Sequence, residues 1–237
     1  MKKTHYMIIT SARKKVQPIC INGLEQKKYI KYLGVYIDQH LKWEPQIQHI
    51  HNKLSKNIGI INKLRYFINL KLLRLLYYSL IYPYLHYAII SWGNTYKTKL
   101  DKIRTKQNTC VRRIFFARNK ESAIPYFSLL EILTLDNVLK MKTASLTHRI
   151  CNKSSFNLTI PSIFDNMLKR SSDIHSHNTR FASQMNFSRP KPRTNYGKFT
   201  FQFLSSHIWQ TIPLNIKVLS PKQFKTRYKS YLLKNQK

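Results

Sequence analysis

The spacing of hydrophobic residues changes along this chain, and its first part is typical of β-strands. Asn22-Gly23 is typical of a tight hairpin turn. The pattern from Tyr29 to Ile37 has period two, which is typical of β-structure: Lys31, Leu33, Val35 and Ile37 share one face, and Ile30, Tyr32, Gly34 and Tyr36 share the other. Gly34 interrupts the second of these faces, and it indicates either a bulge or a place where a backbone or a sugar-phosphate can approach closely. We therefore expect strands between residues 5 and 37.

From Glu44 onward the apolar residues recur at helical spacing. Pro45 suits the first turn of a helix, and a single apolar stripe follows it. The stripe consists of Ile47, Ile50, Leu54, Ile58, Ile61 and Ile68. The opposite face carries Asn52, Lys56, Gly59, Lys63 and Tyr66. This pattern predicts a long helix with one buried and one polar, basic face.

Four more helical patterns follow. Leu70–Tyr82 is apolar almost all round, which predicts a buried helix that Pro83 closes or kinks. Tyr96–Arg118 places its apolar residues on one side and its basic residues on another. The inward residues are Leu100, Ile103, Cys110, Val111 and Ile114, and the basic flank is Lys102, Lys106 and Arg113 with Arg112 beside it. Further helices are expected over Tyr126–Leu133 and Leu135–Asn152. The first three helices, with short connections, predict a small bundle.

The last third of the chain has a different character. Residues 153–200 are polar and rich in turn-forming residues, and Arg189-Pro190-Lys191-Pro192-Arg193 predicts an extended basic segment. A short strand at Phe199–Phe203 and a helix around Ser206–Gln210 are expected next. Ser220-Pro221 predicts the start of a final helix, whose apolar stripe is Phe224, Tyr228 and Leu232.

These elements together predict an α+β fold that is mainly α. We expect strands in residues 1–38, a helical bundle in residues 39–152 and a basic mixed region in residues 153–237 that ends in a helix.

The balance of charged residues indicates what kind of partner the chain binds. The 237 residues include 42 Lys or Arg and only 9 Asp or Glu, a formal net charge of +33. Self-repulsion of this size favours a polyanionic partner. With 43% hydrophobic residues and only 5 Gly and 9 Pro, the chain does not have the composition of a disordered basic tail. The pattern therefore predicts a folded protein whose basic helix faces bind a polyanion, either a nucleic acid, with Lys and Arg on phosphates and aromatic side chains on bases, or anionic lipids.

The residues that metal or nucleophilic chemistry would need are scattered. The five aspartates have no carboxylate neighbour at the spacing of a two-metal site, so we expect no metal ion bound by this chain. Cys20, Cys110 and Cys151 form no zinc motif and no disulfide framework, and fit a reducing compartment. The pairs His49/His51, His148/Cys151 and His175/His177 are expected to have structural or surface roles.

Membrane insertion and secretion are both disfavoured by the pattern. Leu75–Tyr96 has no charged Lys, Arg, Asp or Glu, but Pro83 interrupts it and His86 adds polarity, so a buried helical hairpin is expected instead of a membrane span. The apolar stretch near the N-terminus is too short for a signal peptide. We therefore expect an intracellular protein, nuclear or cytoplasmic.

Several segments, taken in order, resemble a known family. They are Lys3-Thr4 followed by an apolar strand, Tyr32-Leu33-Gly34-Val35-Tyr36-Ile37-Asp38, Leu41-Lys42-Trp43 before a Lys-rich helix, Tyr77–Leu85 with Ser91-Trp92-Gly93, and Arg193-Thr194-Asn195-Tyr196-Gly197 with Trp209 and Phe224-Lys225. This order resembles the C-terminal part of reverse transcriptases, the RNA-directed DNA polymerases, from non-LTR retrotransposons (LINE elements) of the jockey, CR1 and RTE type. The resemblance covers essentially the whole chain.

The resemblance implies roles for particular residues. Lys3 would match an auxiliary lysine that assists proton transfer to the leaving pyrophosphate. Tyr32, Leu33 and Gly34 would match the primer grip, a hairpin that holds the primer terminus. The helix from Glu44 would match the thumb helix that follows the template-primer duplex, with Lys56, Gly59 and Lys63 outward. The fingers, the catalytic aspartate turn and the first metal-binding aspartate of that family would lie upstream of Met1. The resemblance thus implies a chain that binds RNA/DNA template-primer or RNA, is inactive alone, and works with an upstream polymerase region, where Mg²⁺ would bind.

Two other functions stay open at this point. One is a stand-alone basic RNA- or DNA-binding protein with no polymerase role. The other is a basic protein of the membrane surface.

Overall fold

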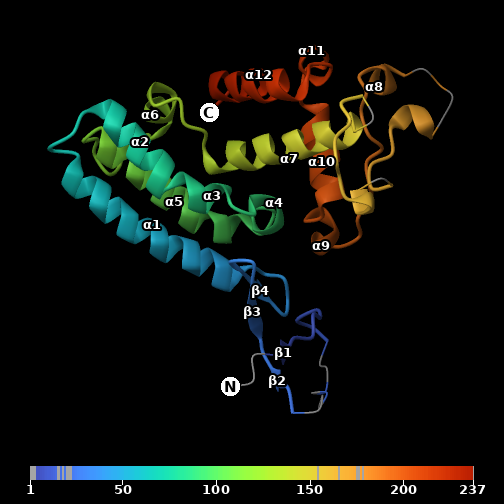
Figure 1. Ribbon diagram of the computed structural model, residues 1–237, viewed down its shortest axis with the longest axis horizontal. Coiled ribbons are helices and arrows are strands. Elements are labelled where there is room, and N and C mark those ends of the chain that lie inside the picture. Colours follow the sequence, from blue (N-terminus) through green and yellow to red (C-terminus); the bar gives the residue numbers. More distant parts are fainter. Residues whose placement is uncertain are drawn as a thin grey trace. The chain divides into compact units, whose positions relative to one another are not determined.

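The computed structural model describes residues 4–14, 17, 19, 23–153, 155–164, 166–174, 177 and 179–236. The chain forms two compact units (Figure 1). The first consists of Met1–Ala88 and Thr95–Ala117, and the second of Ile89–Asn94 and Arg118–Lys237. The division into 1–38, 39–152 and 153–237 that the sequence suggests stays a prediction.

The strands of the first unit form two small sheets. β1 (His5–Tyr6) pairs in parallel with β2 (Glu25–Gln26), and β3 (Tyr29–Tyr32) pairs antiparallel with β4 (Val35–Asp38). The period-two pattern from Tyr29 to Ile37 is thus divided between two strands, and a hairpin is present at residues 32–34, as the resemblance implies. Asn22 lies outside the described residues, so the hairpin expected there stays a prediction.

A two-residue turn divides the period-two segment into a hairpin. Leu33 and Gly34 both have positive φ, 45° and 81°, between the paired residues Tyr32 and Val35. Positive φ at both central residues is the geometry of the tight turn whose twist matches the flanking strands. The glycine is therefore a turn residue, and the apolar-polar alternation on either side of it belongs to two strands.

In the described part of the first unit, four helices accompany the strands. They are α1 (Glu44–Leu64), α2 (Leu70–Leu80), α3 (Tyr82–His86) and α5 (Lys97–Ile114). α1 packs along α5 and contacts α2, α3 and β4. The predicted stripe from Ile47 to Ile61 is buried on α1, and all five predicted inward residues of α5 are buried. The long amphipathic helices were thus predicted correctly, except that α1 ends before Ile68.

The second predicted helix is less buried than its composition suggested. α2 ends at Leu80, and Pro83 stands in the first turn of α3, so the predicted break at this proline is confirmed. However, only Leu73 and Tyr77 of α2 are buried, whereas Leu70, Leu72 and Leu75 are exposed. The prediction of a fully buried helix was therefore wrong, because the neighbours of α2 cover only one of its faces.

The second unit is helical. Its α-helices are α4 (Ile89–Trp92), α6 (Ile124–Leu129), α7 (Leu135–Cys151), α8 (Arg180–Ser183), α9 (Asn195–Lys198), α10 (Phe201–Gln210), α11 (Leu214–Lys217) and α12 (Pro221–Lys234), with 3-10 turns at Ser162–Phe164 and Ser171–Asp173. α7 packs against α4, α10 and α12. The predicted stripe of the final helix, Phe224, Tyr228 and Leu232, is buried.

The strand expected at Phe199–Phe203 is part of a helix instead. Thr200 caps α10, because its hydroxyl accepts a hydrogen bond from the backbone amide of Phe203. The buried residues Ser205, Ile208 and Trp209 then recur at helical spacing. Phe199, Phe201 and Phe203 alternate as residues of a short strand do. The Thr200 cap and the helical spacing of the buried residues that follow favour a helix instead. Overall, the fold is mainly α with a small strand region at its beginning, as expected.

Candidate nucleic-acid interface

The β3–β4 turn presents exposed apolar side chains from a fixed backbone. The side chains of Tyr32 and Leu33 are 63% and 73% exposed. The Tyr87 hydroxyl donates a hydrogen bond of 2.6 Å to the carbonyl of Leu33. The backbone amide of Tyr36 donates to Oε1 of Gln46 on α1 at 3.0 Å. The turn is thus attached to both α1 and the end of α3, and the structure brings the predicted residues Tyr32, Leu33 and Gly34 together at its tip.

The predicted outward residues of α1 lie in one row along the helix. Asn52, Lys56, Gly59 and Lys63 are exposed and follow one another at intervals of four, three and four residues. His49 stands one turn earlier in the same row and packs on the Tyr36 ring of β4, with ring centroids 5.1 Å apart. The row, which we call the α1 row, therefore begins at the hairpin.

The electrostatics of the α1 row keep its first member neutral. Partial burial lowers the pKa of His49, and the nearby ammonium groups of Lys53 and Lys31 lower it further. Its imidazole is therefore neutral at physiological pH. The cationic part of the row is formed by Lys56 and Lys63, with Lys53 exposed beside them.

Gly59 leaves an open place in the middle of the α1 row. A Cβ atom built on this glycine would meet nothing within 4 Å. Glycine in a helix interior costs roughly 0.5–1 kcal/mol relative to alanine. Packing within the chain therefore does not require a glycine at this position.

A pocket joins the hairpin turn to the start of the α1 row. It has a volume of about 420 Å³, and Gly34 and His49 line it together with Tyr84, His86 and Tyr87. Aromatic and imidazole rings around an open pocket can stack on planar groups. The pocket therefore places ring surfaces between the two sets of predicted residues.

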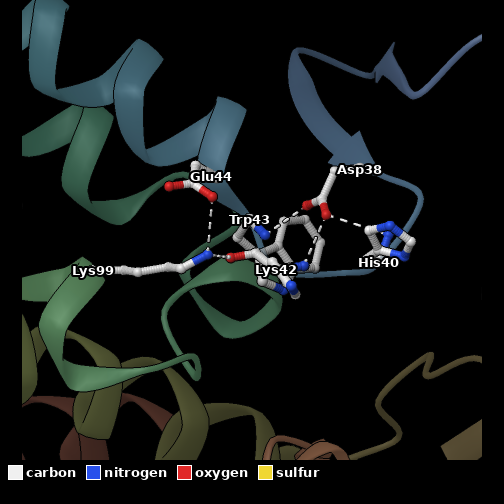
Figure 2. Close-up of polar contacts among 6 residues, drawn as sticks. All are labelled: Asp38, His40, Lys42, Trp43, Glu44 and Lys99. Atoms are coloured by element: carbon white, nitrogen blue, oxygen red, sulfur yellow. Dashed lines mark hydrogen bonds and ion pairs between the residues drawn. The ribbon is translucent and has the colours of Figure 1, made fainter. Parts of the chain in front are cut away.

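The loop between β4 and α1 is held by the carboxylate of Asp38 (Figure 2). Its oxygens accept hydrogen bonds from the backbone amides of His40, Lys42 and Trp43, at 3.3, 3.0 and 2.6 Å. Lys99 of α5 donates to the carbonyl of Lys42 at 3.2 Å and forms an ion pair with Glu44 at 3.3 Å. These contacts fix the first turn of α1 relative to α5 and to the hairpin.

The basic residues predicted on α5 are placed differently from one another. Lys102 is exposed, whereas Lys106, Arg112 and Arg113 are half-buried. The carbonyl of Arg113 accepts a hydrogen bond of 2.8 Å from Nη1 of Arg65. Lys102 lies near the start of α1, as the pocket that they share shows. Of this group, Lys102 is the residue best placed to meet a phosphate.

The predicted basic residues of the tail belong to the second unit. Arg189, Lys191 and Arg193 are exposed in the segment between α8 and α9. The Arg189 guanidinium is hydrogen-bonded to the Gln210 side chain and lies 5.5 Å from the centre of the Phe181 ring. Lys3 lies outside the described residues, so its auxiliary role stays a prediction.

Among the thiols and histidines singled out in the sequence, Cys110 and His148 are buried and Cys151 is half-buried, while Cys20 lies outside the described residues. Burial raises the pKa of Cys110 and of Cys151 to about 12, which keeps both as unreactive thiols. Nε2 of His148 is hydrogen-bonded to the carbonyl of Leu219 at 2.8 Å, and its ring stacks on Phe224 with centroids 4.2 Å apart. Among the described residues, no three His, Cys, Asp or Glu side chains lie close enough to hold a metal ion.

Within the described part of the chain, no helix combines the length and the apolar character that a membrane crossing requires. The Leu75–Tyr96 stretch instead forms α3, α4 and part of α2.

Sequence reasoning missed the lysines around the loop that follows β4. Lys28, Lys42 and Lys99 come from three separate segments, and the fold brings them together. No periodicity connects them, because each belongs to a different element. The one local signal is Asp38 before a short polar loop and a helix, a position at which an Asp side chain often caps backbone amides.

Comparison of the chain with protein-family models, with curated proteins and with solved structures gave no match.

Proposed function

We propose that this chain binds the template-primer duplex of RNA and DNA, as the nucleic-acid-holding C-terminal part of a reverse transcriptase of the non-LTR type. The observation that carries the proposal is the α1 row with its open glycine, which continues to the exposed β3–β4 turn. In this proposal the turn contacts the primer strand, and the lysines of α1 contact the phosphates beside it.

The physical chemistry of the row suits a duplex backbone. Lys56 and Lys63 stand seven residues apart, two helical turns, which corresponds to about 10 Å along the axis. Phosphates on one strand follow one another closely enough for both ammonium groups to be neutralised by the same backbone. Gly59 between them lets the backbone approach without a side chain in its way. Such contacts bind by charge and shape and read little sequence.

A salt titration of the full chain with a short RNA/DNA hybrid tests this proposal. The double variant Lys56→Gln, Lys63→Gln is compared with the matched variant Lys120→Gln, Lys140→Gln, which removes the same charge from exposed positions of the second unit. We expect the first pair to reduce the slope of log affinity against log salt by about two, since each phosphate contact contributes about 0.9. The matched variant should keep the slope. An equal loss in both variants would contradict a defined interface on α1.

The open place at Gly59 permits a second test. Gly59→Leu adds a side chain whose Cβ meets nothing within 4 Å. We expect it to weaken hybrid binding without lowering the unfolding temperature. Unchanged binding would show that no backbone approaches the helix at this point.

The relative affinity for duplex and single strand distinguishes this proposal from the alternative, a stand-alone RNA- or DNA-binding protein. A part that holds template-primer should bind the hybrid at least as tightly as single-stranded RNA of the same length. A clear preference for single-stranded RNA would favour the alternative.

A further inference from the structure

The start of α1 lines a second pocket that none of the α1-row lysines reaches. It has a volume of about 470 Å³, within the range of small-molecule sites. Its walls come from the start of β3 and the residue before it, the end of β4 and the loop after it, the beginning of α1 and the beginning of α5. All of these belong to the first unit.

The pocket has an excess of positive charge. Four lysines, Lys28, Lys42, Lys99 and Lys102, line it together with two carboxylates. Both carboxylates are already engaged. Asp38 accepts from three backbone amides of its own loop, and Glu44 pairs with Lys99.

Three ammonium groups of the pocket remain available to a ligand. Within the described part of the chain, Lys28, Lys42 and Lys102 have no carboxylate within ion-pair distance. The lining therefore has a net charge of +2 with neutral histidine. An anionic ligand would be attracted to it.

The start of a long helix adds to this preference. α1 begins at Glu44 and runs for 21 residues, and its N-cap residue Trp43 makes no side-chain hydrogen bond to the first turn. The dipole of such a helix favours an anion at its N-terminus. Lysines from three other segments and the helix start thus act in the same direction.

The loop that forms one wall is fixed before any ligand arrives. The amide of Gln39 donates to the carbonyl of Lys28, and its carbonyl accepts from the amide of Thr10, both at 2.9 Å. Nδ1 of His40 is hydrogen-bonded to the carbonyl of Thr10 at 2.9 Å. Because the backbone is already ordered, binding costs little conformational entropy.

The lining also contains apolar and aromatic surface. The ring of Tyr29, the ring of Pro45 and the side chain of Ile47 form it. A nucleobase or a sugar can pack on such a surface while an attached phosphate meets the lysines. Inorganic phosphate alone would leave this surface uncovered.

We propose that this pocket binds a nucleoside phosphate, with the phosphate at Lys42, Lys102 and the start of α1 and the base against Tyr29. The same chemistry has two sources, a free nucleotide and the phosphorylated 5′-terminal nucleotide of a bound strand.

Calorimetry of the full chain with adenosine monophosphate, adenosine and inorganic phosphate tests the pocket. We expect adenosine monophosphate to bind more tightly than either component. Lys42→Gln, Lys102→Gln should weaken it about tenfold, whereas Lys56→Gln, Lys63→Gln should not change it. Tyr29→Ala should weaken the binding of adenosine monophosphate and leave the binding of inorganic phosphate unchanged. Circular dichroism and thermal unfolding confirm that each variant is folded, and Lys42→Arg, Lys102→Arg should restore binding.

A second arm identifies the source of the ligand. The affinity of a hybrid with a 5′-phosphate is compared with that of the same hybrid with a 5′-hydroxyl. A preference for the phosphorylated end that Lys42→Gln, Lys102→Gln abolishes assigns the pocket to the strand terminus. If the chain binds adenosine monophosphate and has equal affinity for the two hybrids, the ligand of the pocket is the free nucleotide.

The outcomes separate this proposal from duplex binding. If adenosine monophosphate binds no better than adenosine, or binds equally well to the Lys42→Gln, Lys102→Gln variant, the nucleotide-pocket proposal is overturned. Neither result contradicts hybrid binding by the α1 row. Loss of salt-dependent hybrid binding with intact nucleotide binding overturns the proposed function alone.

Discussion

The hydroxyl of Tyr87 donates a hydrogen bond of 2.6 Å to the carbonyl of Leu33, across 54 positions of the chain. This bond joins the residue after α3 to the tip of the β3–β4 turn, where the exposed side chains of Tyr32 and Leu33 are presented. The Tyr87 side chain therefore holds the turn in place. A substitution at Tyr87 can loosen the turn without changing any basic residue.

Tyr87→Phe should loosen the turn without removing charge. Loss of one partly exposed hydrogen bond costs about 1 kcal/mol. We expect faster amide hydrogen exchange at Leu33 and Gly34 and weaker binding of the RNA/DNA hybrid. Tyr84→Phe, which alters a neighbouring ring of the same pocket, serves as the control. If both variants bind the hybrid as the unmodified chain does, the turn is not part of the interface.

The same substitution at two glycines should have opposite effects on stability. Gly34→Ala places a side chain on a residue with φ of 81°, which costs about 1 kcal/mol, although the nearest atom to its Cβ, Tyr87 Cε1, is at an ordinary 3.7 Å. Gly59→Ala lies in a helix with open space around the new Cβ and should stabilise the protein by roughly 0.5–1 kcal/mol. Denaturant unfolding of the two variants measures both changes. A stabilised Gly34→Ala would contradict the turn conformation.

Arg65 should stabilise the end of α1 through its shape more than through its charge. Its guanidinium lies 4.8 and 4.3 Å from the ring centres of Tyr66 and Phe116 and donates to the carbonyl of Arg113. Lysine keeps the charge but cannot stack and donate in this plane. We expect Arg65→Lys to lower the free energy of unfolding by about 1–2 kcal/mol. The exposed Arg227→Lys should have no such effect, and equal changes would contradict the proposed role.

Lys217 should make the stability of the second unit depend on pH. Its side chain is buried, with Nζ 3.0 Å from the carbonyl of Gln184 and 2.9 Å from Oδ1 of Asn186. Burial lowers its pKa from the usual 10.5 to about 8. Between these two values the unfolded chain binds the additional proton, so the contribution of Lys217 to stability rises with pH and is complete above 10.5.

The measurement compares the free energy of unfolding with and without this lysine. Burial raises the pKa of the nearby Cys151, which acts in the opposite direction at alkaline pH. Both proteins therefore carry Cys151→Ser. The difference in stability between Lys217 and Lys217→Met should grow in favour of lysine from pH 8 to 10.5. A difference independent of pH would contradict the lowered pKa.

The buried faces of the long helices could be predicted because they depend on local spacing. The residues from Ile47 to Ile61 and the stripe of Phe224, Tyr228 and Leu232 recur at the helical period, so any neighbour that packs on them buries the same side. The exposed α1 row follows for the same reason, since it is the other side of that helix. The basic character of the candidate site was therefore visible before the fold.

Other features depended on contacts that the sequence pattern does not contain. Tyr29 to Ile37 alternates as one strand would, and only the positive φ at Leu33 and Gly34 divides it into a hairpin. The exposure of Leu72 and Leu75 likewise depends on how much of α2 its neighbours cover, since an apolar side chain is buried only where another element packs on it.

The sequence by itself determined that this chain forms amphipathic helices with a large excess of positive charge on their outer faces. Only the tertiary structure decided which charges lie together, because Lys28, Lys42 and Lys102 stand on segments far apart in the chain. Helical periodicity is a property of neighbouring residues, whereas a pocket is formed when distant segments pack against one another.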